Sequence, residues 1–237
     1  MAADLSRSAD RRSAGPAGFP EPPAHARQAL SALVAQDPLL GRIEAAAGPL
    51  PWRRRAAGFA GLLQAIIGQQ ISNRAAAAIW SRLAARPEAH DPWRFAALGD
   101  DDLRADGLSR PKMRHARALA TAITEGRLDL DALPLLDDEA AIAAISAIPG
   151  MGRWTAEVYL LFALERADIF PAGDLALAAA LADLRGLDAR PRPPALRAMA
   201  EAWQPWRGLA ARLLWHHWRH VTGRPAMDDV LAGPLPR

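Results

Sequence analysis

The chain has 237 residues, a formal net charge of +3 and 51% hydrophobic residues, which is the composition of a globular protein and excludes a disordered or fibrous one. The absence of cysteine excludes disulfides, a thiolate nucleophile, cysteine-ligated zinc and an iron–sulfur cluster. No apolar run reaches the roughly 18 residues that a membrane span needs. We therefore expect a cytoplasmic protein without a membrane partner.

Strand-forming residues are scarce. There are only four Val, four Thr and ten Ile, whereas Ala, Leu and Arg dominate, so the composition favours an all-helical fold. All basic residues except Lys112 are arginines, and any chemistry that needs a lysine amine has this one candidate. The mild excess of positive charge permits nucleic-acid binding without establishing it.

The helices are read from apolar spacing and from helix-end signals. Residues 1–25 lack an apolar segment and are interpreted as a flexible tail rather than a secretory signal. A long helical run is expected over residues 58–85, interrupted by the polar insert Gly68-Gln69-Gln70. Helix starts are indicated at Asp91-Pro92 and Asp100-Asp101. Other helices are expected at residues 26–36, 110–125, 137–146, 153–166, 174–184, 194–203 and 205–220.

We expect these elements to form one helical domain over residues 26–230, with about ten helices and a C-terminal tail at 231–237. Within the last helical segment, residues 205–220, two tryptophans stand half a turn apart at about 100° per residue. We expect Trp206 to pack inside and Trp215 to face a cleft.

The most informative stretch is Gly150-Met151-Gly152, which stands between two predicted helices. Two glycines let backbone N–H groups approach a ligand closely, and the next helix offers its positive end, so the turn suits a phosphate oxygen. The absence of a preceding strand argues against a dinucleotide fold. A tight helix–helix turn without a ligand is the alternative.

Several ordered motifs resemble those of the helix-hairpin-helix DNA glycosylases, in particular the 3-methyladenine DNA glycosylase II type. They are Phe59-x-x-Leu-Leu-x-x-Ile-Ile-Gly-Gln-Gln-Ile-Ser72, Gly107-Leu-Ser-x-x-Lys112, Ile148-Pro-Gly-Met-Gly-Arg-Trp-Thr-Ala156, Asp168-Ile-Phe-Pro-x-x-Asp174 and Trp203-x-Pro-Trp-Arg207. The resemblance runs from about Pro38 to Trp218. It implies an all-α fold of two packed lobes with the active site in the cleft between them, without the N-terminal β-rich domain that some members carry.

The resemblance also implies roles for individual residues. In the family, the hairpin grips a DNA phosphate, and an aspartate 22 residues after its second glycine is catalytic; here that aspartate is Asp174. Taken alone, Asp174 could equally be the N-cap of the next helix. The expected phosphate contacts are Gly150, Met151, Gly152 and Arg153 of the hairpin, with Ser109 and Lys112 from a separate turn.

The expected reaction is hydrolysis of the N-glycosidic bond of alkylated bases, of the 3-methyladenine type and also 7-methylguanine, in double-stranded DNA. Such bases are cationic, so a carboxylate that stabilises positive charge on the sugar suffices. Relatives that also cut the strand carry a Schiff-base lysine where this chain has Trp154, which predicts no lyase activity. The alternatives are a non-catalytic DNA-binding hairpin protein and a glycosylase for deaminated or etheno bases.

The base must leave the helix before it can be cut, and family resemblance places the residue that fills the gap at Gln70, with Gln69 beside it. A helix kink that ties up these two side chains is the alternative. The expected base pocket is formed by Trp215, Trp154, Val158 and Trp52. Val158 replaces a pocket tyrosine of the best-known member, which leaves the range of accepted bases open.

No cofactor is expected to be required. Some relatives hold a monovalent cation through hairpin carbonyls, which here belong to Ser146, Ile148 and Met151, so Na⁺ or K⁺ could bind there. His216, His217 and His220 are interpreted as structural or surface histidines because no carboxylate stands at matching helical spacing. The expected partner is double-stranded DNA with alkylated bases, and the expected state is a monomer.

Overall fold

A computed structural model describes residues 21–223, and within this range every regular element is a helix. The described residues form twelve α-helices and three short 3₁₀-helices, without a strand, so the expected all-α fold is confirmed. The expected segment 231–237 and residues 1–20 of the expected tail lie outside the described range. The first helix begins at Ala24.

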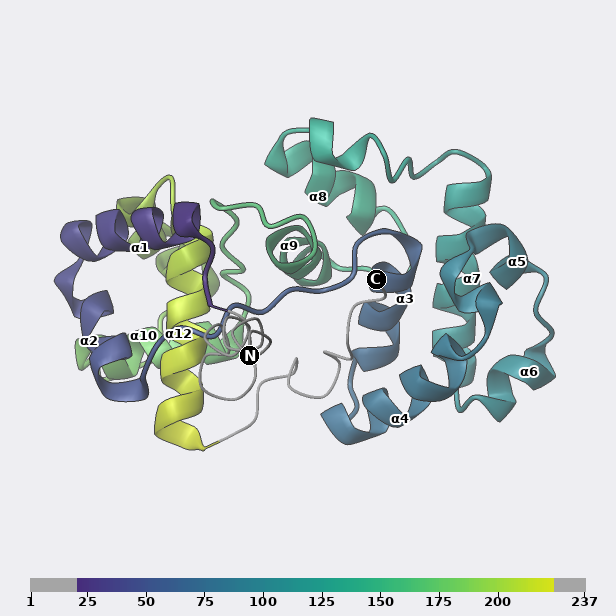
Figure 1. The fold of residues 1–237 in the computed structure, drawn as a ribbon, viewed down its shortest axis with the longest axis horizontal. Coiled ribbons are helices and arrows are strands. Elements are labelled where there is room, and N and C mark those ends of the chain that lie inside the picture. Colours follow the sequence, from purple (N-terminus) through teal and green to yellow (C-terminus); the bar gives the residue numbers. More distant parts are fainter. Residues whose placement is uncertain (1–20, 224–237) are drawn as a thin grey trace, which may run out of the picture. The chain divides into compact units, whose positions relative to one another are not determined.

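The helices divide into two compact units. Among the described residues, unit 1 comprises 21–53 and 172–223, and unit 2 comprises 54–171. Figure 1 labels the α-helices of both units except α11. Unit 1 contains α1 (Ala24–Gln36), α2 (Pro38–Ala47), α10 (Leu175–Arg185), α11 (Pro193–Ala200), η3 (Glu201–Trp203) and α12 (Arg207–Thr222).

Helix α12 is the centre of unit 1, because it packs against α1, α2 and α10. Leu33, Leu40 and Leu213 are fully buried in the core of unit 1. Trp203 is also fully buried, and its indole N–H donates to Asp37 Oδ2 at 3.0 Å. This packing fixes α12 beside the start of α10, where the candidate catalytic residue lies.

Unit 2 is built around α3, which packs against α4, α7 and α9. Its buried residues, including Leu62, Leu63, Ile66 and Ile67, recur at the spacing of a helix that is covered on most sides. The helices of unit 2 are α3 (Gly58–Gly68), α4 (Asn73–Ala84), η1 (Pro87–His90), α5 (Pro92–Ala96), α6 (Asp100–Ala105), α7 (Arg110–Thr124), η2 (Leu133–Leu135), α8 (Asp138–Ser146) and α9 (Arg153–Phe162).

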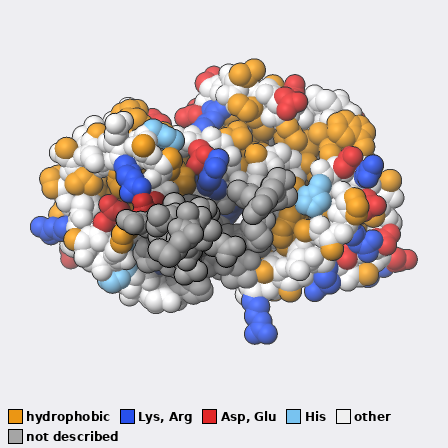
Figure 2. All heavy atoms as spheres, in the orientation of Figure 1, with side chains coloured by type: hydrophobic (Ala, Val, Ile, Leu, Met, Phe, Trp, Pro, Cys, Tyr) orange, Lys and Arg blue, Asp and Glu red, His pale blue; other side chains and the backbone are white. Residues whose placement is uncertain are grey.

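Much of the positive charge of unit 2 is neutralised locally. Arg86 binds Asp106 at 2.7 Å, and Arg117 binds Asp100 at 2.7 Å. Basic and acidic side chains accordingly lie side by side over this unit in the space-filling view (Figure 2). These arginines stabilise the packing of α6, α7 and the loop after α4.

The expected run over residues 58–85 is two helices, α3 and α4, because the turn after Gly68 cannot continue a helix. Gln70 has a left-handed backbone (φ 57°), and the Ser72 side chain caps α4 by accepting from Ala75 N at 3.2 Å. The expectation for Trp206 was wrong: it precedes α12 and is only partly buried. The fully buried tryptophan of this region is Trp203.

Candidate functional site

The Gly150-Met151-Gly152 turn joins α8 to α9 and is closed by a hydrogen bond from Met151 N to Ile148 O at 2.9 Å. Met151 is buried and anchors the turn, whereas both glycines are exposed. Gly150 has a left-handed backbone (φ 86°), and a Cβ there would strike the ring of His115. The protein itself therefore requires glycine at position 150.

Gly152 is different, because it has φ −80° and no heavy atom within 4 Å of the place where a Cβ would lie. Nothing within the described protein demands a glycine here. Gly152 is the N-cap of α9, and its missing side chain exposes the first backbone N–H groups of that helix, which point away from the helix body. A group from outside, such as an anion, could thus approach this helix end closely.

Arg153 follows the hairpin and braces its two helices. Its Nη atoms donate to Glu139 of α8 at 2.8 and 2.6 Å, and its Nε donates to Glu157 of α9 at 2.8 Å. The hydrogen bonds to Glu139, followed by the charge of Glu157, hold the pKa of Arg153 above its ordinary value. The structure thus gives Arg153 two carboxylate partners, and its contact with a phosphate stays a prediction.

Gln69 and Gln70 are expected from the sequence to act together, but they have different environments. Gln69 is partly buried, and its Nε2 donates to Gly150 O at 2.9 Å, with Thr155 Oγ1 at 3.5 Å. Gln70 is exposed at the tip of the turn. Gln69 therefore ties this turn to the hairpin, and Gln70 is the side chain that the turn presents.

Ser109 and Lys112 lie at the start of α7. Ser109 is exposed, and its side chain makes no capping hydrogen bond. Lys112 instead points into unit 2, where its Nζ donates to three carbonyls at the end of α3, those of Ile66, Ile67 and Gln69. Desolvation by partial burial lowers the pKa of Lys112. The geometry of Lys112 favours these three carbonyl contacts over the phosphate contact expected from the sequence.

A cavity of about 250 Å³ in unit 2 brings together four of the predicted site residues, Trp154, Val158, Gln69 and Gln70. Arg55 and the buried Gln64 also line it. Tyr159, next to Val158, does not line it: its hydroxyl oxygen accepts from Gly58 N at 2.8 Å, and burial raises its pKa. The cavity thus has one aromatic wall, Trp154, beside the side chains of Gln64, Gln69 and Gln70.

Asp174 lies in unit 1 and is the N-cap of α10. Its Oδ1 accepts from Ala176 N at 2.8 Å, from Leu177 N at 3.0 Å and from Trp215 Nε1 at 3.2 Å. The capping role considered from the sequence is therefore real. It does not exclude catalysis, because the same hydrogen bonds and the positive end of α10 stabilise an ionised carboxylate. The side chain is partly exposed.

Trp52, also in unit 1, is packed rather than open. It is 6% exposed, and the guanidinium of Arg212 lies 4.3 Å from the centre of its ring. Arg212 is held there by a 2.7 Å hydrogen bond from its Nη1 to Arg53 O. One face of the ring is therefore covered within unit 1, and the stacking of a base on Trp52 stays a prediction.

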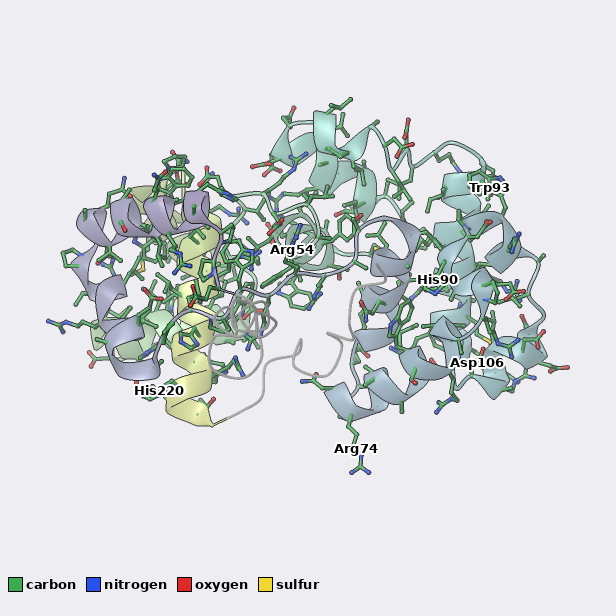
Figure 3. All side chains as sticks on the ribbon, viewed as in Figure 1. Arg54, Arg74, His90, Trp93, Asp106 and His220 are labelled. Carbon is green, nitrogen blue, oxygen red and sulfur yellow. The ribbon has the colours of Figure 1, made fainter. Side chains whose placement is uncertain are left out.

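Two features missed by the sequence analysis lie beside the predicted residues. Arg74 is exposed in the first turn of α4, just after the Gln70 turn, and its side chain projects away from the helix (Figure 3). Leu175, directly after Asp174, is 75% exposed. The signal for Arg74 was its position two residues after the capping serine, whereas no pattern in the sequence distinguishes Leu175.

The described residues contain no group of three or more His, Asp or Glu side chains that could hold a metal ion. His216 Nε2 instead pairs with Gly48 O at 3.0 Å, and His217 Nε2 with Asp183 at 2.6 Å. At the hairpin, Ile148 O accepts from Met151 N, and the expected cation there stays a prediction. Between residues 21 and 223 no helix has the length and apolarity to cross a membrane.

A glycine hairpin between two helices, with an aspartate capping a later helix 22 residues on, defines a helix-hairpin-helix fold of the DNA glycosylase type. The family model of the HhH-GPD superfamily of base excision DNA repair proteins matches residues 63–207, more than half of the chain. The chain belongs to this superfamily.

Relatives and solved structures agree with that assignment. DNA-3-methyladenine glycosylase 1 of Schizosaccharomyces pombe is 30% identical over 158 residues, 65% of this chain and 69% of that protein. DNA-3-methyladenine glycosylase 2 of Escherichia coli is 30% identical over 188 residues, 75% of this chain and 64% of that protein. The structure of the S. pombe enzyme Mag1 in complex with abasic DNA has a TM-score of 0.71 at 27% identity and covers 81% of this chain and 95% of that one.

Other relatives are much longer than the matched part. The chain spans 43% of the Bacillus subtilis relative and 35% of the Mycobacterium tuberculosis relative that it matches, which is less than half of either.

Proposed function

We propose that this protein is a monofunctional DNA glycosylase that hydrolyses the N-glycosidic bond of alkylated bases in double-stranded DNA and so initiates base excision repair. Membership of the superfamily supports the reaction class, and relatives named as DNA-3-methyladenine glycosylases support the substrate class. The proposed bases are 3-methyladenine and 7-methylguanine.

The observation that carries the proposal is the environment of Asp174. Three donors converge on its Oδ1, which orients the carboxylate. We assign to the partly exposed carboxylate of Asp174 the position beside the sugar. As the bond to the base breaks, positive charge develops on the deoxyribose, and a fixed carboxylate stabilises that charge.

The charge on the leaving group explains why one carboxylate is enough. An alkylated purine such as 3-methyladenine is cationic, so its bond to the sugar is weakened and the base needs little protonation to leave. Water then adds to the sugar, and Asp174 can accept a hydrogen bond from it. Neutral lesions such as hypoxanthine or ethenoadenine require more help, so we expect slower release of those bases. The reaction as proposed requires no cofactor.

The absence of lyase activity is proposed from two residues. Trp154 occupies the position of the Schiff-base lysine in strand-cutting relatives. The one lysine of the chain, Lys112, has its Nζ within 3.0 Å of three carbonyl oxygens in unit 2, which engages all three of its N–H donors. A lysine ammonium whose three N–H groups all donate has no lone pair with which to attack the sugar.

The proposed DNA contacts are the N-terminus of α9 at Gly152 and the exposed Ser109, both in unit 2. Asp174 and Trp215 are in unit 1, so one chain supplies all the residues that the proposal requires. We accordingly propose a monomer acting on double-stranded DNA in the cytoplasm. Na⁺ or K⁺ bound by the carbonyls of Ser146, Ile148 and Met151 would strengthen the hairpin's hold on a phosphate.

The test is to incubate the protein with methylated duplex DNA and to identify the released bases by mass. The wild type should release 3-methyladenine and 7-methylguanine, and Asp174→Asn should lose most of that activity while still binding DNA. Unchanged release by Asp174→Asn would refute the assignment of the catalyst. Binding without release of any base by the wild type would instead indicate a non-catalytic DNA-binding protein. Trapping of a covalent adduct with borohydride would overturn the monofunctional assignment.

A further inference from the structure

The ammonium group of Lys112 occupies the C-terminal end of α3. Its Nζ lies 3.0 Å from Ile66 O, 2.5 Å from Ile67 O and 2.7 Å from Gln69 O. These oxygens belong to the last turn of the helix and to its C-cap, where carbonyls carry partial negative charge. Ile66 O also accepts from the backbone N–H of Gln69 at 3.3 Å. Lys112 therefore caps the C-terminal end of α3, although it lies more than 40 residues further along the chain.

The residue type suits this geometry. A lysine ammonium is a compact point charge with three N–H donors, whereas the five donors of arginine are spread over a rigid plane. Three carbonyl oxygens that converge on one nitrogen fit the first group and not the second. In a chain whose other basic residues are all arginine, the single lysine stands where an arginine could not make the same contacts.

What Lys112 holds is the turn that presents Gln70. Its third acceptor, Gln69 O, is the carbonyl that directly precedes Gln70. The Gln69 side chain fixes the other side of the turn by donating to Gly150 O of the hairpin. Between these two attachments, Gln70 adopts a left-handed backbone (φ 57°) that is costly for a residue other than glycine, and its side chain is exposed.

We propose that Lys112 is a positioning residue: it fixes the Gln69–Gln70 turn so that Gln70 can fill the space left by an extruded nucleotide, and it does not act as a phosphate contact. The inference rests on the proposed glycosylase function. Lys112 acts through Gln70, because it constrains the backbone that carries that side chain and touches neither sugar nor base. It should therefore affect the extrusion of the base and not the cleavage of the bond.

The test compares Lys112→Arg and Lys112→Met on two duplexes that carry one 7-methylguanine. In the first duplex the damaged base is paired with cytosine, and in the second it lies opposite an abasic analogue, where no pairing opposes extrusion. Both variants should lose about tenfold in single-turnover release from the paired duplex, the size of effect expected when hydrogen bonds to a charged group are removed. The loss on the second duplex should be about twofold or less.

A phosphate contact gives a different pattern. Arginine binds phosphate as well as lysine does, so Lys112→Arg would then keep wild-type activity. Lys112→Met would weaken binding to both duplexes equally and reduce the dependence of log K on log salt by about one. Either result would overturn the inference. Arg114→Met removes an exposed, positively charged side chain from the same helix. This variant should leave the ratio of rates on the two duplexes unchanged.

A double-mutant cycle keeps the test decisive if the Lys112 variants lose stability. If Lys112 acts through Gln70, then Lys112→Arg should add no further loss to Gln70→Ala on the paired duplex. Losses that multiply would show that the two residues act independently and would overturn the inference. A wild type that releases no base from either duplex would instead refute the proposed function, so the two failures are distinguishable. Thermal melting of each variant shows whether the assays are run on folded protein.

Discussion

The indole N–H of Trp215 donates to Asp174 Oδ1 over 3.2 Å, which joins the middle of α12 to the first residue before α10. Both residues belong to unit 1, and both are partly exposed. From the sequence, Trp215 is expected to line the base pocket. The structure adds a second role, because Trp215 also holds the proposed catalytic carboxylate in place.

Replacement of Trp215 by Phe tests this second role, since it keeps an aromatic ring and removes the N–H donor together with the five-membered ring of the indole. Hydrogen bonds to charged groups contribute about 1.5–3 kcal/mol, so release of 7-methylguanine should slow by roughly tenfold to one hundredfold. The measurement is single-turnover release at saturating enzyme. Trp218→Phe on the same helix is the control and should keep at least half of the wild-type rate. Equal effects of the two substitutions would contradict the role of the N–H.

The capping and catalytic roles of Asp174 can be separated by two substitutions. Asn caps helices as well as Asp does, so Asp174→Asn should unfold at nearly the same denaturant concentration as the wild type. Asp174→Ala removes the cap and should lower the free energy of unfolding by about 1 kcal/mol. Both variants should lose base release, because neither carries a charge beside the sugar. Substantial activity in Asp174→Ala would show that this carboxylate only caps the helix.

Helix ends were the most predictable part of the fold. Helix α8 was expected from the acidic start at Asp137, whose side chain does cap it by accepting from Ala140 N at 2.8 Å. The end of α7 was expected before Gly126, which has a left-handed backbone (φ 72°). Helix α2 was missed, although Asp37 followed by Pro38 is a standard helix start. Local signals of this kind depend on a few neighbouring residues, which is why the sequence shows them.

Contacts between distant residues could not be predicted in the same way. The sequence indicates a polar insert at Gly68-Gln69-Gln70, but it does not indicate that the carbonyls at the end of α3 accept from Lys112, which is more than 40 residues away. The phosphate contact of Lys112 was expected from the family resemblance of the turn before it, which does not indicate that its Nζ lies at the end of α3. The distinction between Gln69 and Gln70 also follows from one tertiary contact, the hydrogen bond from Gln69 to Gly150 O.

The open space at Gly152 leads to a prediction about DNA binding. Alanine fits the backbone of residue 152 (φ −80°), so Gly152→Ala should fold with wild-type stability. The added methyl group would lie where the proposed phosphate approaches the N-terminus of α9, so affinity for duplex DNA should fall about tenfold. Fluorescence anisotropy with an unmodified duplex measures this affinity.

Gly99→Ala is the matched control, because Gly99 is also the N-cap of a helix, with φ −70° and no capping side chain. A Cβ there would make only an ordinary contact, 3.5 Å from Asp102 Oδ2. This variant should bind DNA as the wild type does. If Gly152→Ala also binds normally, the hairpin does not approach DNA through this helix end.

The left-handed backbone of Gln70 predicts that its replacement by glycine raises stability and lowers activity. Glycine adopts this conformation without the penalty that a side chain imposes, so Gln70→Gly should raise the free energy of unfolding by about 0.5–1 kcal/mol. It should also slow release from a paired duplex, because the side chain proposed to fill the gap is gone. Chemical denaturation and single-turnover release measure the two effects on the same preparation.

Glu165 supplies the comparison for that experiment, since it is the other non-glycine residue among 21–223 with a left-handed backbone (φ 52°). Its ion pair with Arg54, at 2.6 Å, is partly exposed and stabilises the fold by about 1 kcal/mol. Glu165→Gly relieves the same kind of strain without changing the Gln70 turn, so its rate of release should match that of the wild type. A Gln70→Gly variant that is stabilised and fully active would mean that Gln70 is not inserted into DNA.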